Sequence, residues 1–443
     1  MGKIELDHTG SGSGVTISSD GTDLLLDGTA IGGGGTALEL YAENPSSPSA
    51  PSATGTNAVA IGNGAAASAF ETISIGRDSD ATSANNIALG RLAQSTGTNG
   101  ALALGFYASA SGERSISIGS GTSAFSSVSA GLGSVALGTS RASGTDSFAA
   151  AIANNTSSYG ATGANSVAMG PTAKASSSGA VSLGGISGAS SLASNTLAVS
   201  IGWATASGSG AVAIGSNSQA TATQTNSVAI SGNSTATYST SIGKSSDNSN
   251  SGASGSGAIG LSGGLAQGQD SFAALLDARS VAANSVAIGS RARANQIGKY
   301  VFANGRFAAA GDAQTGTFVL RSDTTDTTPE SLTTNNSTAG NANQVILPNN
   351  SAYFFSGTII AREQASSGTD VGAWEIKGAI RREANAASTV LIKSTIDDFN
   401  VPTGWVVALT ADTTNGGLAV TVTGAASTNI RWVGTVTSSE VTY

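Results

Sequence analysis

The chain has no cysteine and a single histidine, His8, among its 443 residues. Disulfides and thiolate metal sites are therefore excluded, and one chain cannot assemble a Ser-His-Asp triad or a histidine-rich metal site. Charged residues make up only 10% of the chain, and the net charge is −8. Because nucleic-acid binding needs clustered Lys and Arg, we expect no nucleic-acid partner, and we also expect no metal and no cofactor.

Long apolar runs are missing as well. No stretch of 18 apolar residues occurs, and the first seven residues, Met1 to Asp7, lack the apolar core of a secretory signal. We therefore expect neither membrane insertion nor an export signal. Aromatic residues contribute 5%, but 60 glycines and 39% hydrophobic residues are present. Their periodic placement favours an ordered chain over a disordered one.

One six-residue motif recurs through the middle of the chain, and its clearest copy is Asn284-Ser285-Val286-Ala287-Ile288-Gly289. Early copies end at Gly62, Gly76, Gly90 and Gly105, which are 14 or 15 residues apart. Such a period is typical of a solenoid in which each repeat forms one coil. The alternating residues predict a short strand, and the glycine allows a sharp turn. We predict two strands and two turns in each coil.

The alternation gives each motif strand two faces. We expect Val286 and Ile288 to fill the interior of the coil and Ala287 to face outward. So thin a coil would leave its small apolar face uncovered, which predicts self-association about the shaft axis. Two longer intervals, from Gly119 to Gly138 and from Gly184 to Gly202, predict loops that bulge from single coils.

The repeated Asn-(Ser/Ala)-Val-Ala-(Ile/Met)-Gly motif resembles the head repeats of trimeric autotransporter adhesins of the YadA type, over about residues 57–305. This resemblance implies a left-handed parallel β-roll with three chains packed side by side. Phage fibres use the same roll. The expected fold is therefore all-β, with a trimeric β-solenoid shaft.

The flanking segments differ from the shaft, which we place at residues 57–311. Residues 1–35 predict a small β-meander for attachment, because Asp20-Gly21 and Asp27-Gly28 separate short apolar runs. Residues 36–56, with three prolines among Ser and Ala, predict a linker that follows a glycine hinge at 32–35.

Residues 312–443 predict an antiparallel β-sandwich or jelly roll, because seven or so strands recur between turn signals. A Thr- and Asn-rich loop spans residues 322–343. Several segments resemble the C-terminal domains of phage tail fibres: Gly311–Gln314, Val319–Asp326, Ala373–Ile380 and Arg431–Val436. Two others, Lys3–Gly12 and Asp20–Gly28, resemble the start of marine-phage fibre proteins of the podovirus or myovirus kind.

Two repeated segments invite a functional interpretation, Asp146-Ser147-Phe148 and Asp270-Ser271-Phe272. A cation or glycan contact is one reading; the other is a coil variant whose Phe fills the roll and whose Asp completes a turn. The aromatics Phe106, Tyr107 and Trp203 follow motif glycines and should lie near the outer surface.

Catalysis is the first alternative function, because some phage fibres cleave polysaccharides. Glycoside hydrolysis needs two carboxylates at a defined separation. Alternation on a strand would put Asp78 and Asp80 on one face, although a pair on a solvated turn is the other reading, and Asp397 and Asp398 would point to opposite faces. No catalytic constellation emerges, so we expect no enzyme activity.

Receptor-binding candidates lie in the C-terminal domain: Tyr353, Trp374, Arg381, Trp405 and Trp432. Core packing is the default role for the tryptophans, and the loop 322–343 is the better place for recognition, near the shaft junction.

The sequence as a whole predicts a homotrimeric phage tail fibre on the virion, outside the cell. Its N-terminus would hold another tail protein, and its tip would bind a host cell-surface glycan or outer-membrane receptor. The alternatives are a fragment of a bacterial trimeric surface adhesin and a fibre with depolymerase activity.

Overall fold

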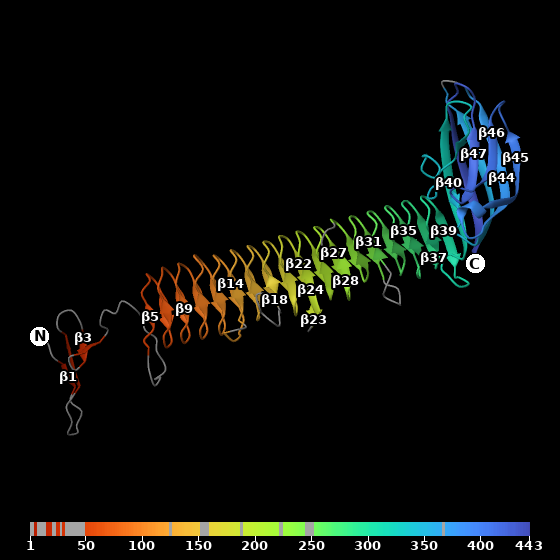
Figure 1. Cartoon of the computed structure of the whole chain (residues 1–443). Coiled ribbons are helices and arrows are strands. Elements are labelled where there is room, and N and C mark those ends of the chain that lie inside the picture. The colour runs from red at the N-terminus through yellow and green to blue at the C-terminus, as the bar shows by residue number, and fades with distance from the viewer. Residues whose placement is uncertain are drawn as a thin grey trace. The chain divides into compact units, whose positions relative to one another are not determined.

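The computed structural model describes residues 49–123, 126–150, 159–186, 189–220, 225–243, 252–365 and 368–443, together with four short strands nearer the N-terminus. The chain forms two compact units, Met1–Pro171 and Thr172–Tyr443. Figure 1 shows repeating coils in both units, and longer strands near the C-terminus.

The four N-terminal strands pair antiparallel in chain order, as a meander does. They are β1 (Ile4–Leu6), β2 (Val15–Ser19), β3 (Leu24–Leu26) and β4 (Thr29–Ile31). The predicted hinge at 32–35 and the linker up to residue 48 lie outside the described residues. The first coil strand begins at Ser52, inside the segment predicted as linker.

Each coil of the first unit contributes one strand to each of two parallel sheets, as the repeat predicted. The three-residue strands are β6 (Val59–Ile61), β8 (Ile73–Ile75), β10 (Ile87–Leu89), β12 (Leu102–Leu104), β14 (Ile116–Ile118), β16 (Val135–Leu137), β18 (Phe148–Ala150) and β20 (Val167–Met169). The two-residue strands are β5 (Ser52–Ala53), β7 (Ala66–Ala67), β9 (Asp80–Ala81), β11 (Gln94–Ser95), β13 (Ser109–Ala110), β15 (Val128–Ser129), β17 (Arg141–Ala142) and β19 (Gly160–Ala161).

The second unit begins with coils of the same design. Its motif strands are β22 (Val181–Leu183), β25 (Val199–Ile201), β27 (Val212–Ile214), β29 (Val228–Ile230), β31 (Thr240–Ile242), β33 (Ile259–Leu261), β35 (Phe272–Ala274), β37 (Val286–Ser290) and β39 (Tyr300–Asn304). The other sheet holds β21 (Ala173–Ala175), β24 (Ala189–Ala193), β26 (Ala204–Ala206), β28 (Ser218–Ala220), β30 (Asn233–Ser234), β32 (Gly252–Ala253), β34 (Leu265–Ala266), β36 (Arg279–Ser280) and β38 (Arg293–Ala294). The long interval before Gly202 contains a short antiparallel pairing of β23 (Gly185–Ile186) with β24, which accounts for the predicted bulge.

The faces of the motif strand are opposite to the prediction. Ala287 is fully buried inside its coil, whereas Val286 and Ile288 are only half-buried on the outside. The same holds for Ala60 between Val59 and Ile61. The interior of so narrow a coil is filled mainly by alanine and serine, with few larger side chains such as Asn86, so the β-branched side chains of the motif point outward. The uncovered apolar face is therefore the Val and Ile face.

Many of the buried serines that share the interior with alanine are hydrogen-bonded there, although the hydroxyls of Ser227 and Ser241 have no partner among the described residues. Ser74 and Ser79 lie with their hydroxyl oxygens 2.7 Å apart, and the Ser79 hydroxyl also donates to the Gly76 carbonyl. Gly76 itself has a φ of +134°, and a Cβ there would lie 2.5 Å from the carbonyl oxygen of Gly90 in the next coil. The glycine that ends each motif therefore permits both the turn and the close stacking of coils.

The first residue of the motif is also explained by the turn. Asn57, Asn165 and Asn284 all have positive φ, near 55–60°. Asparagine tolerates this left-handed conformation better than most residues do.

The C-terminal strands form two antiparallel sheets, as predicted for a sandwich. The larger sheet has the order β40 (Ala313–Thr324), β48 (Ile430–Thr442), β43 (Ser351–Glu363), β44 (Val371–Arg382) and β45 (Val390–Asn400). In the smaller sheet β47 (Gly417–Thr423) pairs with β41 (Glu330–Ser331), β42 (Val345–Ile346) and β46 (Val406–Asp412). A short 3-10 helix, η1 (Ala386–Ser388), precedes β45.

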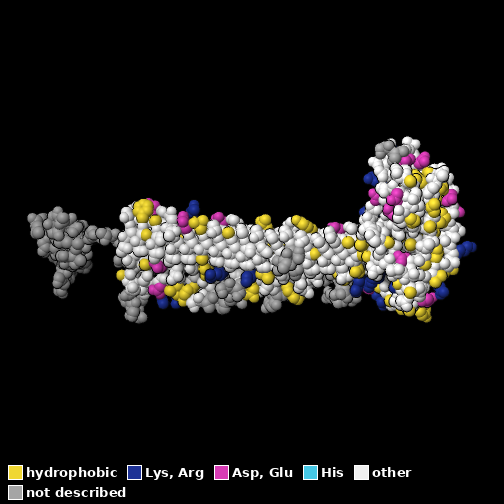
Figure 2. All heavy atoms as spheres, turned by 45° about the horizontal axis from the view of Figure 1, so that its top comes forward, with side chains coloured by type: hydrophobic (Ala, Val, Ile, Leu, Met, Phe, Trp, Pro, Cys, Tyr) yellow, Lys and Arg dark blue, Asp and Glu magenta, His cyan; other side chains and the backbone are white. Residues whose placement is uncertain are grey.

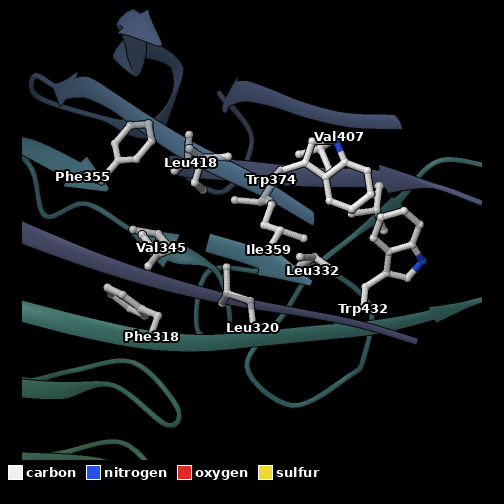
Figure 3. Close-up of a cluster of buried hydrophobic side chains, with 14 of the residues drawn as sticks. Phe318, Leu320, Leu332, Val345, Phe355, Ile359, Trp374, Val407, Leu418 and Trp432 are labelled. Atoms are coloured by element: carbon white, nitrogen blue, oxygen red, sulfur yellow. The ribbon is translucent and has the colours of Figure 1, made fainter. Parts of the chain in front are cut away.

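Large side chains from both sheets fill the space between them (Figure 3). Phe318, Phe355 and Trp432 come from the larger sheet, and Leu418 and Val407 come from the smaller one. We call residues 313–443 the tip. The larger tip sheet continues the motif sheet of the solenoid, because β40 pairs antiparallel with β39. The last coil strand ends at Asn304 and the first tip strand begins at Ala313, on either side of the predicted boundary at residue 311, and backbone hydrogen bonds join the two strands.

Candidate functional site

The outer face of the motif strands presents an apolar row, which we call the shaft stripe. It consists of the first and third residues of each motif strand, such as Val286 and Ile288 on β37 and Tyr300 and Phe302 on β39. Tyr300 and Phe302 are 41% and 47% exposed. An exposed apolar row of this kind is a candidate interaction surface.

The two Asp-Ser-Phe segments are ordinary copies of the motif. Asp146 and Asp270 have φ near 51°, as the motif asparagines do, and Phe148 is the register partner of Val135 and Val167. The Phe side chains thus lie half-buried on the shaft stripe, and the prediction that they fill the roll is wrong. The interior position is held by the alanine that follows each Phe.

The aromatics that follow motif glycines lie outside the coils, as predicted. Trp203 is 45% exposed. Phe106 and Tyr107 are half-buried, and the Arg91 guanidinium lies 5.1 Å from the Phe106 ring centroid.

The joint between the last coil and the tip contains a buried ion pair. The Lys299 ammonium lies 2.8 Å from Oε2 of Glu440, and both side chains are almost fully buried. The same carboxylate accepts hydrogen bonds from Gln314 at 2.8 Å and from the Ser438 hydroxyl at 2.7 Å. The Lys299 ammonium also lies 5.1 Å from the centroid of the Phe318 ring. Burial lowers the pKa of Lys299, although the Glu440 charge acts in the opposite direction.

Tyr353, a predicted receptor residue, belongs to this joint. It is buried, and its ring centroid lies 5.5 Å from the Lys299 ammonium. Burial raises the pKa of Tyr353, and its hydrogen bond to the Glu440 carboxylate adds to the shift. Its hydroxyl is occupied by the joint, so the residue does not offer a surface to a receptor.

The three tryptophans of the tip are buried as well, which corrects their assignment as receptor contacts. Trp432 is fully buried, and its ring centroid lies 5.4 Å from that of Trp374 and 5.5 Å from that of Trp405. Its indole N–H donates to the Thr324 hydroxyl at 2.9 Å. These rings form the core of the sandwich, because only a gap between two sheets has room for them. Of the five predicted residues, Arg381 alone is exposed, where it pairs with Glu383.

A polar groove of about 540 Å³ lies at the end of the tip strands remote from β39. Arg362 and Arg431 are direct register partners on neighbouring strands there, and Arg431 is also the partner of Asp323. The side-chain amides of Gln364 and Asn429 join the lining and are hydrogen-bonded to each other at 2.8 Å. We call this the arginine groove.

A second groove, of about 460 Å³, shares Asp323 with the first and is lined by the loop predicted for recognition. Asn336 donates to the Asp323 carboxylate at 3.0 Å, and Ser322 donates to Glu330 at 2.7 Å. The loop is fastened to the last coil, since the Ile297 N–H donates to the carbonyl of Ala342 at 2.9 Å. The prediction that it lies near the shaft junction is therefore confirmed.

The two carboxylate pairs considered for catalysis are Asp78 with Asp80 and Asp397 with Asp398. Asp78 sits in a turn with φ 54° and pairs with Arg77, whereas Asp80 begins strand β9, so the two do not share a strand face as alternation suggested. Burial raises the pKa of Asp80. Asp397 and Asp398 are both exposed. In the part of the chain that the structure describes, no group of three or more acidic, His or Cys side chains could hold a metal ion.

Among the described residues no helix has the length and hydrophobicity needed to cross a bilayer.

Comparison with known proteins supports the solenoid assignment. The family model of the YadA head domain repeat (2 copies) matches residues 53–79, 99–122, 161–185, 193–218 and 206–230. All five segments lie in the coils described above. No curated protein matches the chain. The chain thus carries YadA head domain repeats, folded as a parallel β-solenoid.

Proposed function

We propose that this protein is a homotrimeric adhesive fibre, in which the solenoid serves as the shaft and the tip binds a receptor on a host cell. The observation that carries the proposal is the shaft stripe, an apolar face that runs over coils whose own interior is complete without it. The coils need no further side chains inside, so the stripe is free to pack against identical chains. The YadA head repeats support an adhesin-like role.

Light scattering on the full-length chain tests the trimer. We expect three times the chain mass for the wild type and a single chain mass for Ile288→Arg, because a charge on the shaft stripe would have to be buried without a partner. The matched control is Ser254→Arg, which changes an exposed residue outside the stripe. A soluble wild-type monomer at micromolar concentration would contradict the proposal.

The receptor site of this fibre would be the two grooves of the tip that share Asp323. Two adjacent arginines are suited to bind a carboxylate or phosphate group, and amides beside them suit hydroxyl groups. Both features fit an acidic host glycan. Threefold repetition would add avidity to weak individual sites.

Competition for adsorption tests this site. Purified wild-type protein should block attachment of the particle or cell that carries the fibre, and the double variant Arg362→Ala/Arg431→Ala should block it at least about tenfold less well, in line with the loss of one or two anchor residues. Lys393→Ala, another exposed cation of the tip, serves as the control. If the double variant competes as well as the wild type, recognition lies elsewhere, and Arg381 and Trp203 become the next residues to change.

The carrier of the fibre is proposed to be a phage virion. The resemblance of the terminal segments to phage fibre proteins supports this, with the N-terminal strands holding a tail protein and the C-terminus pointing outward. A bacterial surface adhesin is the second candidate, and the YadA head repeats favour it equally. Gold labels on the two termini distinguish them: label on phage particles, with Tyr443 away from the particle wall, supports the virion, and label on bacterial cells supports the adhesin.

Binding without catalysis is part of the same proposal. It is supported by the closest carboxylate pair of the solenoid, because Asp78 and Asp80 do not share a strand face. Incubation of the protein with capsular polysaccharide and measurement of released reducing ends would test it, and measurable release would favour a depolymerase.

A further inference from the structure

The outer face of the larger tip sheet is apolar and hydroxyl-bearing although it is exposed in the single chain. Val319 on β40, Val433 on β48 and Ile360 on β43 are 53%, 42% and 50% exposed. Thr435 and Thr358 lie between them in register. Together with Phe354 these residues define what we call the tip face. Figure 2 shows hydrophobic side chains over the visible surface of the tip as well as on the shaft.

The tip face is the continuation of the shaft stripe. In the antiparallel pairing of β39 with β40, Tyr300 is opposite Thr317 and Phe302 is opposite Thr315. Directly opposed residues of a sheet point to the same side. The side on which the shaft stripe lies therefore passes onto the outer side of β40, β48 and β43 with no break in the hydrogen-bonded sheet.

Charged side chains are absent from the middle of this face and begin with Arg321 at its end, in register with Val433 and Ile360. No charged side chain points outward from β40 between Thr315 and Val319, from β48 between Val433 and Val441, or from β43 between Ala352 and Ile360. The next row beyond Arg321 consists of Asp323, Arg431 and Arg362 and is charged throughout. The next strand, β44, carries Glu375 and Lys377 outward.

An uncharged face is what contact between identical chains requires. Like charges meet when a surface packs against its own copy about a symmetry axis, and a buried unpaired charge is costly. Valine, isoleucine and threonine pack against their own kind without that cost. A glycan site would instead present the polar and charged groups that the arginine groove contains.

We propose that the tip face packs against other copies of this chain, so that the trimer contact extends from the shaft stripe onto the tip. This inference rests on the proposed trimer and adds to it a second contact region. It also assigns the free surface of the tip: the two grooves that share Asp323 and the smaller sheet stay open to solvent and to the receptor.

Because the chain has no cysteine, single-cysteine variants of the full-length protein test the contact directly. Thr435→Cys reports on the tip face, Ile288→Cys reports on the shaft stripe, and Thr410→Cys on exposed β46 of the smaller sheet is the control. Each protein is treated with a short bis-maleimide and run on a denaturing gel. We expect covalent dimers from Thr435→Cys and Ile288→Cys, and only background from Thr410→Cys.

The rate at which each thiol reacts with a small maleimide is the second measurement. We expect Thr435→Cys to react at least about tenfold more slowly than Thr410→Cys, because a packed interface excludes the reagent as a protein interior does. If Ile288→Cys is cross-linked while the thiol of Thr435→Cys reacts fast and is not cross-linked, the inference is overturned and the shaft trimer stands. No cross-linking at either position, with both thiols fast, would overturn the trimer itself. Equal cross-linking at Thr410→Cys would mean chance collision and would also overturn the tip contact.

Discussion

The shaft coils and the tip use one continuous sheet in opposite ways. In the coils the small side chains are inside, and the larger apolar ones, such as Ile288, are half-buried on the outer face. In the tip the large side chains, such as Trp432, are inside, and the outer face is mostly threonine and valine. The difference follows from the space each architecture encloses. A coil of about 14 residues encloses space mainly for small side chains such as alanine and serine, whereas two sheets packed about 10 Å apart have room for indole rings.

The tip and the coils also differ in what stabilises them and in which apolar side chains are left for contact with other chains. The tip has a core of its own, drawn from both of its sheets. The coils are held by backbone hydrogen bonds to their neighbours and by a thin row of alanines and serines, so their larger apolar groups remain available for other chains. A solenoid of this kind is stable because each coil stacks on the next, not because it surrounds a large core.

The largest expected effect comes from a bulky charge inside a coil. Ala287→Arg should destabilise the protein by at least about 5 kcal/mol, because the side chain can neither fit nor find a partner there. Its neighbour Ile288→Arg should leave the coil folded and lose only association. Circular dichroism melts and light scattering on both variants measure the difference. The opposite outcome, a folded Ala287→Arg and an unfolded Ile288→Arg, would show that the faces of the strand are reversed.

The next largest expected effect is a loss of stability when the core of the tip is changed. Trp432→Ala should cost about 3–5 kcal/mol, since it empties a buried site between two other tryptophans and leaves the Thr324 hydroxyl without its indole donor. Phe399→Ala, at a residue 70% exposed, is the matched control and should change stability by less than about 0.5 kcal/mol. Denaturant unfolding measures both. Lost adsorption with unchanged stability in Trp432→Ala would instead restore this residue as a receptor contact.

A smaller effect is expected at the joint, where the buried groups are a pair of opposite charges and not the small side chains of the coils or the large apolar ones of the tip. Glu440→Gln should cost about 3 kcal/mol, because it leaves the Lys299 ammonium buried without a counter-charge. The double variant Lys299→Met/Glu440→Leu should recover most of that loss, because it removes both charges together. Unfolding midpoints of the wild type and the two variants decide this. If Glu440→Gln matches the wild type, the ion pair contributes nothing to stability.

The smallest effect is a pH dependence at Tyr353. Burial raises its pKa in the folded chain above the ordinary value near 10, so the folded state keeps a proton that the unfolded state loses. Its contribution is therefore complete below pH 10 and is lost as the pH rises above that value. Compared with Tyr353→Phe, the wild type should lose about 0.7 kcal/mol between pH 9.5 and 10.5, because the unfolded tyrosine is on average half deprotonated over that range. Parallel pH profiles for the two proteins would contradict this assignment.

Sequence periodicity determined much of the architecture. The spacing of Gly62, Gly76 and Gly90 was sufficient for coils of two strands and two turns, because backbone hydrogen bonding between equal repeats is local and regular. Turn signals and apolar runs located the long tip strands, because both depend on residues close together in the sequence. The positive φ of Asn284 could also have been inferred, since asparagine and glycine at the two ends of each motif are typical of left-handed turns.

The tertiary structure alone decided which face of each strand is inside. Alternation separates Ala287 from Ile288 without saying which is inward, and the usual rule that larger apolar residues are buried fails when the enclosed space is too narrow for them. Nor did the sequence show that Lys299 and Glu440 meet, because they are far apart in the chain and come together only where β39, β40 and β48 share one sheet. That same pairing joins shaft to tip, places Tyr353 and the tryptophans in the interior, and leaves the paired arginines, Arg362 and Arg431, at the surface. Contacts between distant segments depend on which strands pair, and a single chain's local pattern does not specify this.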